Sequence, residues 1–191
     1  MRIISGKYKG RNFSAKLPTG IRPTQDAMRE TIFNVLNNYI DIDGSVVADV
    51  CAGAGMLGLE ALSRGAKYAY FVDKSGKAVE YIRNSIEMVS QALETYKILN
   101  LDALQYIGHQ ALVTQSGAEN TPIDLLFLDP PYKTDIVNAS LELLTTAGIL
   151  ANDGIIVAET AVHTVIELYG FFETITTRQF GAAKVSFLRK I

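Results

Sequence analysis

Residues 124–132 of this chain read DLLFLDPPY. After the first residue, four apolar side chains follow one another, which is typical of a buried strand in a parallel sheet. The polar break at Asp129 then places a carboxylate at the C-terminal end of that strand, where open α/β sheets bind their ligands. This stretch predicts a parallel α/β sheet with a ligand site beside Asp129.

The four residues Asp129, Pro130, Pro131 and Tyr132 have the chemistry to hold a planar base. Two consecutive prolines fix two φ angles and lack backbone donors, so the carbonyls of this turn can accept hydrogen bonds from a ligand. A carboxylate, a carbonyl and an aromatic ring suit a base with an exocyclic amino group. The alternative is a plain strand-to-helix turn, in which Asp129 caps the next segment and Tyr132 packs.

Strand and helix patterns alternate around this stretch. The expected strands are residues 45–50, 68–72, 96–100, 124–128 and 154–159, and the expected helices are residues 57–64, 76–89, 103–107 and 135–146. Residues 171–180 and 184–188 are expected to close the chain as an antiparallel hairpin. The alternation predicts a doubly wound, mostly parallel sheet. In front of it, residues 2–5 and 11–14 predict a β-hairpin, and Thr24 is placed to cap a helix that runs to about Tyr39.

The loop after the first strand of the sheet reads DVCAGAGMLG, residues 49–58. Gly53, Gly55 and Gly58 have the G-x-G-x-x-G spacing, and Asp73 lies 20 residues beyond Gly53 at the end of the next strand. This pattern fits a dinucleotide site, with the acidic residue on a ribose hydroxyl, and makes a nicotinamide-dependent oxidoreductase one candidate. The same crevice can bind S-adenosylmethionine, which has a ribose and an adenine but no pyrophosphate.

Asp49 favours S-adenosylmethionine. An acidic residue before the glycines would repel the phosphates of a dinucleotide at the helix terminus, whereas it would attract a sulfonium or ammonium group. Asp102, after the third strand, either accepts a hydrogen bond from the adenine amino group or caps the helix that follows it. Cys51 is expected to be a small loop residue and not a nucleophile, because nothing near it in the sequence would activate a thiolate.

Composition indicates a globular protein with one main domain and at most a small appendage. The chain has 191 residues, of which 48% are hydrophobic and 20% charged. A single cysteine fits a reducing compartment, and no segment approaches the length of a membrane span, so we expect a cytoplasmic protein. His109 and His163 are isolated in the sequence, and no metal site is expected.

Charge is unevenly distributed along the chain. The net charge is −2, yet residues 1–30 hold seven basic and two acidic side chains, so the remainder is acidic. A basic arm on an acidic body is typical of proteins that contact nucleic-acid phosphates, although lysine and arginine also protect exposed strand edges. The expected backbone contacts are Lys7, Lys9, Arg11, Arg22 and Arg29, with the alternative for Arg29 that it forms a structural ion pair.

Taken together, these motifs resemble the RsmD family, bacterial 16S ribosomal RNA guanine-N2 methyltransferases that use S-adenosylmethionine. The resemblance rests on the loop 49–58, the DPPY motif at 129–132, and three further stretches: RIISG at 2–6, RPT at 22–24 with RETIFN at 29–34, and GLEALSRG at 58–65. It covers essentially the whole chain. Where other members often carry Phe at the fourth position of the catalytic motif, this chain has Tyr132, which can also stack.

The resemblance implies a seven-stranded, Rossmann-like methyltransferase domain at 41–191 behind a basic, rRNA-contacting hairpin and helix at 1–40. It implies catalytic roles for Asp129, Pro130 and Tyr132. The expected cofactor-binding residues are Asp49, Cys51, Ala52, Gly53, Gly55, Asp73, Asp102 and Asp129. The expected substrate-binding residues are Lys7, Lys9, Arg11, Arg22, Arg29 and Pro131.

The implied partner is 16S rRNA in a small ribosomal subunit or an assembly intermediate, and we expect a monomer. A DNA adenine-N6 methyltransferase remains an alternative, because DPPY also serves adenine. The short chain leaves little room for a DNA-recognition region. A non-catalytic rRNA-binding assembly factor is a further alternative from another class.

Overall fold

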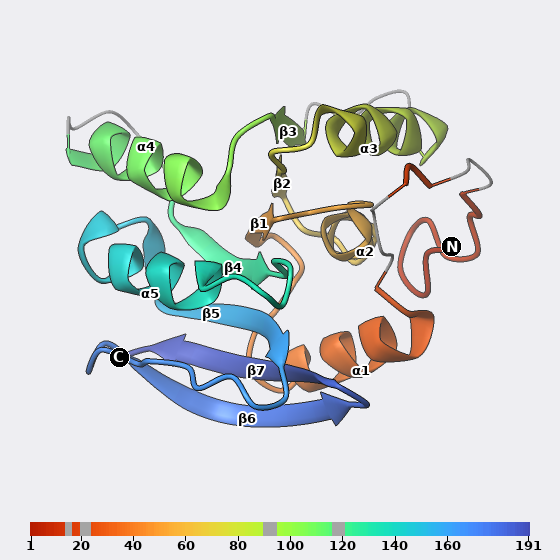
Figure 1. Cartoon of the computed structure of the whole chain (residues 1–191). Coiled ribbons are helices and arrows are strands. Elements are labelled where there is room, and N and C mark those ends of the chain that lie inside the picture. The colour runs from red at the N-terminus through yellow and green to blue at the C-terminus, as the bar shows by residue number, and fades with distance from the viewer. Residues whose placement is uncertain (14–16, 20–23, 90–94, 116–120) are drawn as a thin grey trace.

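A computed structural model describes residues 1–13, 17–19, 24–89, 95–115 and 121–191 (Figure 1). Seven strands form one sheet in the order β3-β2-β1-β4-β5-β7-β6. The strands are β1 (Val46–Val50), β2 (Tyr68–Val72), β3 (Tyr96–Leu99), β4 (Ile123–Leu128), β5 (Leu150–Ala161), β6 (Phe172–Phe180) and β7 (Ala183–Lys190). The helices are α1 (Asp26–Leu36), α2 (Met56–Ser63), α3 (Gly76–Val89), α4 (Ala103–Gln115) and α5 (Ile136–Ala147).

The first five strands are parallel, and β7 runs antiparallel between β5 and β6. The predicted doubly wound sheet with a C-terminal antiparallel hairpin is therefore confirmed. The chain winds outward from β1 to β3 and then returns to place β4 on the other side of β1. The C-terminal ends of β1 and β4 thus lie side by side where the winding reverses, which is the usual ligand position in such sheets.

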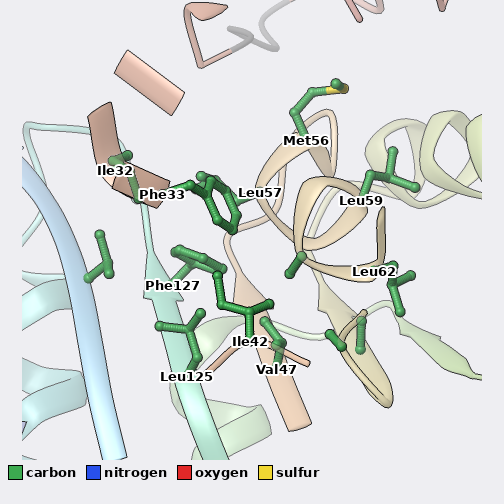
Figure 2. Close-up of a cluster of buried hydrophobic side chains, with 14 of the residues drawn as sticks. Ile32, Phe33, Ile42, Val47, Met56, Leu57, Leu59, Leu62, Leu125 and Phe127 are labelled. Atoms are coloured by element: carbon green, nitrogen blue, oxygen red, sulfur yellow. The ribbon is translucent and has the colours of Figure 1, made fainter. Parts of the chain in front are cut away.

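Helices cover both faces of the sheet (Figure 1). On one face, side chains of α1, α2 and α3 form a buried cluster with strand residues, and on the other face α4 and α5 form a second cluster. Figure 2 shows part of the first cluster, where Phe33 of α1 and Leu57 of α2 lie near Phe127 of β4. The rings of Phe33 and Phe127 are 5.9 Å apart. Helix α1 therefore packs directly on the strand that precedes the DPPY turn.

The N-terminal segment is less regular than expected. The predicted hairpin consists of one antiparallel bridge between Arg2 and Asn12, and Ser14 lies outside the described residues. Ile3, Tyr8 and Phe13 are buried in the same cluster as α1 and α2. Side-chain packing against the body and backbone hydrogen bonds between residues 1–3 and 10–13 together hold this segment.

The RIISG and GLEALSRG stretches contact each other in the fold. Backbone N–H groups of Ile4 and Ser5 donate to the two carboxylate oxygens of Glu60, at 2.8 and 2.9 Å. Gly6 lies so close to α2 that a Cβ atom on it would be 1.8 Å from the Ser63 carbonyl oxygen. The N-terminal segment is thus bound to the helix that follows the glycine loop.

Several boundaries differ from the sequence prediction. Helix α1 begins at Asp26 with Gln25 as its N-cap, and Thr24 does not cap it. Helix α4 continues through Gly108 to Gln115, whereas the prediction ended it at residue 107. Isolated glycine in a helix costs only about 1 kcal/mol relative to alanine, so the packing of Tyr106, Ile107 and Ala111 in the second cluster outweighs it. Strand β5 extends beyond both predicted ends because its outer residues pair with β4 and β7.

Candidate active site

The glycine loop leaves β1 in a left-handed backbone conformation. Cys51, Gly53 and Gly55 have φ values of 62°, 53° and 70°. A Cβ atom on Gly55 would lie 2.9 Å from Ile82, and one on Gly58 would lie 2.4 Å from the ring of Phe71. Gly55 therefore serves both conformation and packing, whereas Gly58 allows α2 to approach β2 closely.

Two carboxylates support this loop. Asp49, on β1, is fully buried and accepts a hydrogen bond from the Gly58 N–H at 2.9 Å. Asp73, after β2, accepts from the Gly53 N–H at 2.8 Å and from the Ser75 N–H at 2.8 Å. Both acidic residues that were predicted to bind the cofactor thus accept hydrogen bonds from the glycine loop.

The pKa of Asp49 is raised to about 7: burial is the largest cause, the Gly58 hydrogen bond opposes it, and the nearby charge of Asp73 contributes to the rise. A positive charge placed beside a buried carboxyl group offsets the cost of its ionisation. The site therefore favours a ligand that brings positive charge.

Asp102 caps helix α4. Its carboxylate accepts from the Gln105 N–H at 2.9 Å, and the Gln105 side chain accepts from the Asp102 N–H at 3.2 Å. This reciprocal pair is a capping box. The capping alternative for Asp102 is confirmed, and its contact with adenine stays a prediction.

Cys51 is half-buried in the loop. The pKa of its thiol is raised to about 12. Burial is the largest cause, and the charges of Asp73, Asp129 and Asp49 contribute to the rise. The thiol is therefore protonated at neutral pH, which agrees with the expectation that Cys51 is not a nucleophile.

Asp129 directly follows β4 and lies next to the part of β5 that contains Glu159. Because Leu128 pairs with Ala158, the residues that follow them, Asp129 and Glu159, lie side by side on the same face of the sheet. Burial raises the pKa of Asp129 well above its usual value, and the charges of Glu159 and Asp49 raise it further. Burial also raises the pKa of Glu159. Asp129 after β4 and Glu159 on β5 thus form a pair of neighbouring carboxyl groups whose charges repel each other.

The rest of the DPPY turn bends over this pair. Pro130 is buried and Pro131 exposed, and the Pro131 carbonyl accepts from the Thr134 N–H and hydroxyl at 3.1 and 2.7 Å. Tyr132 is 39% exposed, and its hydroxyl donates to Glu159 at 2.5 Å. The turn, Glu159 and Thr160 line a small recess. Glu159 is not among the predicted site residues, although its place at the end of an expected strand indicated a possible role in the site.

The predicted rRNA-binding residues have different environments. Lys7 and Lys9 are exposed, and the Lys7 amine lies 5.4 Å from the Tyr8 ring centroid. Arg11 donates to the carbonyls of Met88 and Val89 at the end of α3, at 2.9 and 2.6 Å, so it also caps that helix. Arg22 lies outside the described residues.

Arg29 corrects the prediction of an rRNA contact. Its side chain is fully buried and donates to the carbonyls of Thr24 and Arg2 and to the Asp26 carboxylate. A guanidinium with these partners and no solvent exposure is not available to an RNA phosphate. The structural alternative for Arg29 is therefore correct, with Asp26 and Glu60 as its acidic neighbours.

Within the described ranges, no three His, Cys, Asp or Glu side chains are grouped so as to hold a metal ion. Among the helices that the structure describes, none combines the length and apolar character needed to cross a membrane.

Comparison with known proteins shows the family. The model of the family described as "Conserved hypothetical protein 95" matches residues 1–189. "Putative rRNA methyltransferase YlbH" of Bacillus subtilis is 38% identical over 159 residues, which are 83% of this chain and 82% of that protein. "Ribosomal RNA small subunit methyltransferase D" of Escherichia coli is 31% identical over 163 residues, which are 85% of this chain and 76% of that protein.

A solved structure supports the same assignment. "Putative methyltransferase yhhF from Escherichia coli" matches with a TM-score of 0.79 and 27% identity, over 100% of this chain and 97% of that one. Sequence and fold thus agree over nearly the full length, and this chain belongs to the RsmD family, whose model is described as "Conserved hypothetical protein 95".

Proposed function

We propose that this protein transfers a methyl group from S-adenosylmethionine to the exocyclic N2 amino group of a guanine in 16S rRNA, within a small ribosomal subunit or its assembly intermediate. Membership of the RsmD family supports the rRNA methyltransferase class. The observation that carries the proposal is the position of Asp129. This half-buried carboxyl group directly follows β4, the strand next to β1, which leads into the glycine loop.

The residues around the glycine loop fit S-adenosylmethionine. When bound, it supplies an electrophilic methyl group on a sulfonium. Asp49 and Asp73 both contact the glycine loop, and two acidic groups there would disfavour a dinucleotide pyrophosphate. Asp73, at the end of β2, is in the position to accept a hydrogen bond from a ribose hydroxyl, and the backbone at Cys51, Ala52, Gly53 and Gly55 forms the adjoining wall.

The DPPY turn would orient the amino group that receives the methyl. The guanine amino lone pair is delocalised into the ring, so the nitrogen must be turned toward the donor before it attacks. Asp129 and the Pro130 carbonyl would accept the two amino hydrogens, and Asp129 can take the proton that the nitrogen loses. Tyr132 would stack on a base removed from its helix or loop, next to Pro131.

Lys7 and Lys9 are the described residues that best suit contacts with the rRNA backbone, because both are exposed on the N-terminal segment. Such contacts contribute affinity and register but little sequence choice. The segment is bound to α2 through Glu60 and Ser63, so the bound rRNA would be held at a fixed position relative to the cofactor loop.

The test is transfer of labelled methyl from S-adenosylmethionine to small ribosomal subunits that lack the native modification, with naked rRNA and duplex DNA as parallel substrates. We expect N2-methylguanosine from the particle. Label in DNA adenine would instead establish an adenine-N6 methyltransferase. Binding of S-adenosylmethionine and of the particle without transfer would establish a non-catalytic assembly factor, and binding of a nicotinamide cofactor would establish an oxidoreductase.

A further inference from the structure

Glu159 lies on strand β5 directly after the last residue that pairs with β4, and it is still paired with Val185 of β7. Its side chain is on the same face as Asp129, since the residues before them pair across β4 and β5. Its carboxylate accepts a hydrogen bond from the Tyr132 hydroxyl at 2.5 Å. Strand β5 therefore contacts the aromatic ring of the turn through a charge-assisted hydrogen bond.

We propose that Glu159 is a positioning residue for the methyl-accepting base: its carboxylate holds the Tyr132 hydroxyl and thereby fixes the Tyr132 ring beside Asp129. The inference rests on the proposed function, because the ring is taken to stack on that base.

The ring needs such an anchor. Tyr132 is 39% exposed and follows the exposed Pro131, so packing alone encloses only part of its side chain. Ordering an exposed side chain at the moment of binding costs conformational entropy and so weakens binding. A hydrogen bond to a residue of the sheet places the ring in advance, and a base that stacks on it then meets a surface already in position.

Glu159 also influences Asp129. The two half-buried carboxyl groups repel each other when both are ionised, whereas the Tyr132 hydrogen bond favours the ionised form of Glu159. Asp49 is the further acidic group that acts on Asp129. The Tyr132 contact thus favours a resting state in which Glu159 is ionised and Asp129 holds the proton. A hydrogen donated to Asp129 by the amino group would then favour ionised Asp129.

The test compares kcat and KM for methyl transfer to undermethylated small subunits by the wild type, Tyr132→Phe, Glu159→Ala and the double variant. Loss of a charge-assisted hydrogen bond predicts about a tenfold lower kcat in each single variant. Because both variants remove the same contact, the double variant should lie within about twofold of either one. A double variant about a hundredfold below the wild type would overturn the proposal, because the two residues would then act independently.

Glu159→Gln separates the contact from the charge. Its amide oxygen can still accept from Tyr132, so kcat at alkaline pH should stay within about twofold of the wild type. Removal of the charge beside Asp129 lowers the pKa of Asp129, so the acid limb of the pH–kcat profile should move to lower pH. The matched control is Glu142→Gln, an exposed position on α5, which should leave the profile unchanged. A Glu159→Gln variant as slow as Glu159→Ala with an unmoved acid limb would contradict the proposal.

A measurement without substrate distinguishes this proposal from the proposed function. The free protein is labelled with ¹³C at the ζ carbon of tyrosine, and the Tyr132 resonance is assigned by its loss in Tyr132→Phe. We expect this resonance to shift in Glu159→Ala and to stay in place in Glu142→Gln. An unshifted resonance in Glu159→Ala would show that Glu159 does not hold the ring. Absence of methyl transfer by the wild type would overturn the proposed function, and the resonance still decides whether Glu159 holds the ring.

Discussion

The Arg29 guanidinium on α1 and the Glu60 carboxylate on α2 face each other in the interior, with 3.9 Å between Nε and Oε2 and both side chains fully buried. Burial lowers the pKa of Arg29, and the charges of Asp26 and Glu60 oppose this effect. Glu60 also accepts from Arg64 and from two backbone N–H groups of the N-terminal segment. The pair therefore links α1, α2 and the N-terminal segment.

Replacement of Arg29 should destabilise the protein. In Arg29→Ala, Glu60 loses one of its cationic neighbours, and the carbonyls of Arg2 and Thr24 lose their donor. Breaking a buried pair in this way costs about 3–5 kcal/mol, measured as the free energy of unfolding in urea. The adjacent exposed residue gives the control, Glu30→Ala, which should change stability by less than about 0.5 kcal/mol. Unchanged stability together with weaker particle binding would restore Arg29 as an rRNA contact.

Sequence patterns were sufficient for the sheet, because apolar runs with polar or glycine breaks mark its strands and the alternation with helices determines its winding. They were not sufficient for Arg29 or Glu159. The basic side chains of residues 1–30 look alike in sequence, and only the packing of α1 against α2 decides that Arg29 is buried while Lys7 is exposed. Glu159 contacts Tyr132 because Leu128 at the end of β4 pairs with Ala158 of β5, a register that the sequence does not reveal.

The glycines of α2 and α4 should respond oppositely to alanine. In Gly58→Ala the new methyl would lie 2.4 Å from the Phe71 ring, so α2 must shift, at a cost of about 1–3 kcal/mol. Gly108, in α4, has no atom within 4 Å of the equivalent position, so Gly108→Ala should stabilise by about 0.5–1 kcal/mol. Thermal unfolding of both variants measures the difference. Equal effects of the two substitutions would show that α2 is not packed against β2 in this way.

Asp49 should make stability depend on pH. Its pKa is raised from 3.8 to about 7, so between these values the folded protein holds a proton that the unfolded chain has released. The free energy of unfolding of the wild type should therefore fall as pH rises through this interval, by up to about 1.4 kcal/mol per pH unit. Asp49→Asn removes this loss and keeps an oxygen for the Gly58 N–H.

Urea unfolding of the wild type and Asp49→Asn at pH 4, 6 and 8 measures this effect as a difference between the two proteins. We expect equal stability at pH 4 and a more stable variant at pH 8, with weaker binding of S-adenosylmethionine because its positive charge loses a partner. Asp153→Asn, at an exposed position of β5, is the control. If the free energy of unfolding depended on pH in the same way in the wild type and in Asp49→Asn, Asp49 would not be a buried group that holds a proton.

Charge reversal on the N-terminal segment should weaken particle binding. Lys7→Glu with Lys9→Glu replaces two exposed cations, and the affinity for small subunits should fall and become less dependent on salt. The control, Lys67→Glu with Lys97→Glu, makes the same change in net charge at two other exposed positions. Lys67 lies directly before β2, and Lys97 lies on β3. Binding of S-adenosylmethionine should be unaffected in both. Equal loss of particle affinity in the two double variants would show that net charge matters and the N-terminal segment does not.

Replacement of Asp129 should separate methyl transfer from cofactor binding. Asp129→Ala removes the carboxylate that would accept a hydrogen of the amino group, so the rate of methyl transfer should fall by at least about a hundredfold. Binding of S-adenosylmethionine, measured by calorimetry, should largely remain, because Asp49, Asp73 and the glycine loop are intact. In the wild type, burial and the neighbouring acids hold the pKa of Asp129 well above its usual value. The transfer rate should therefore fall as pH drops through that raised pKa, since protonated Asp129 accepts a hydrogen bond from the amino group less well. Near-normal turnover of Asp129→Ala would remove Asp129 from the catalytic site and leave the DPPY turn with a structural role alone.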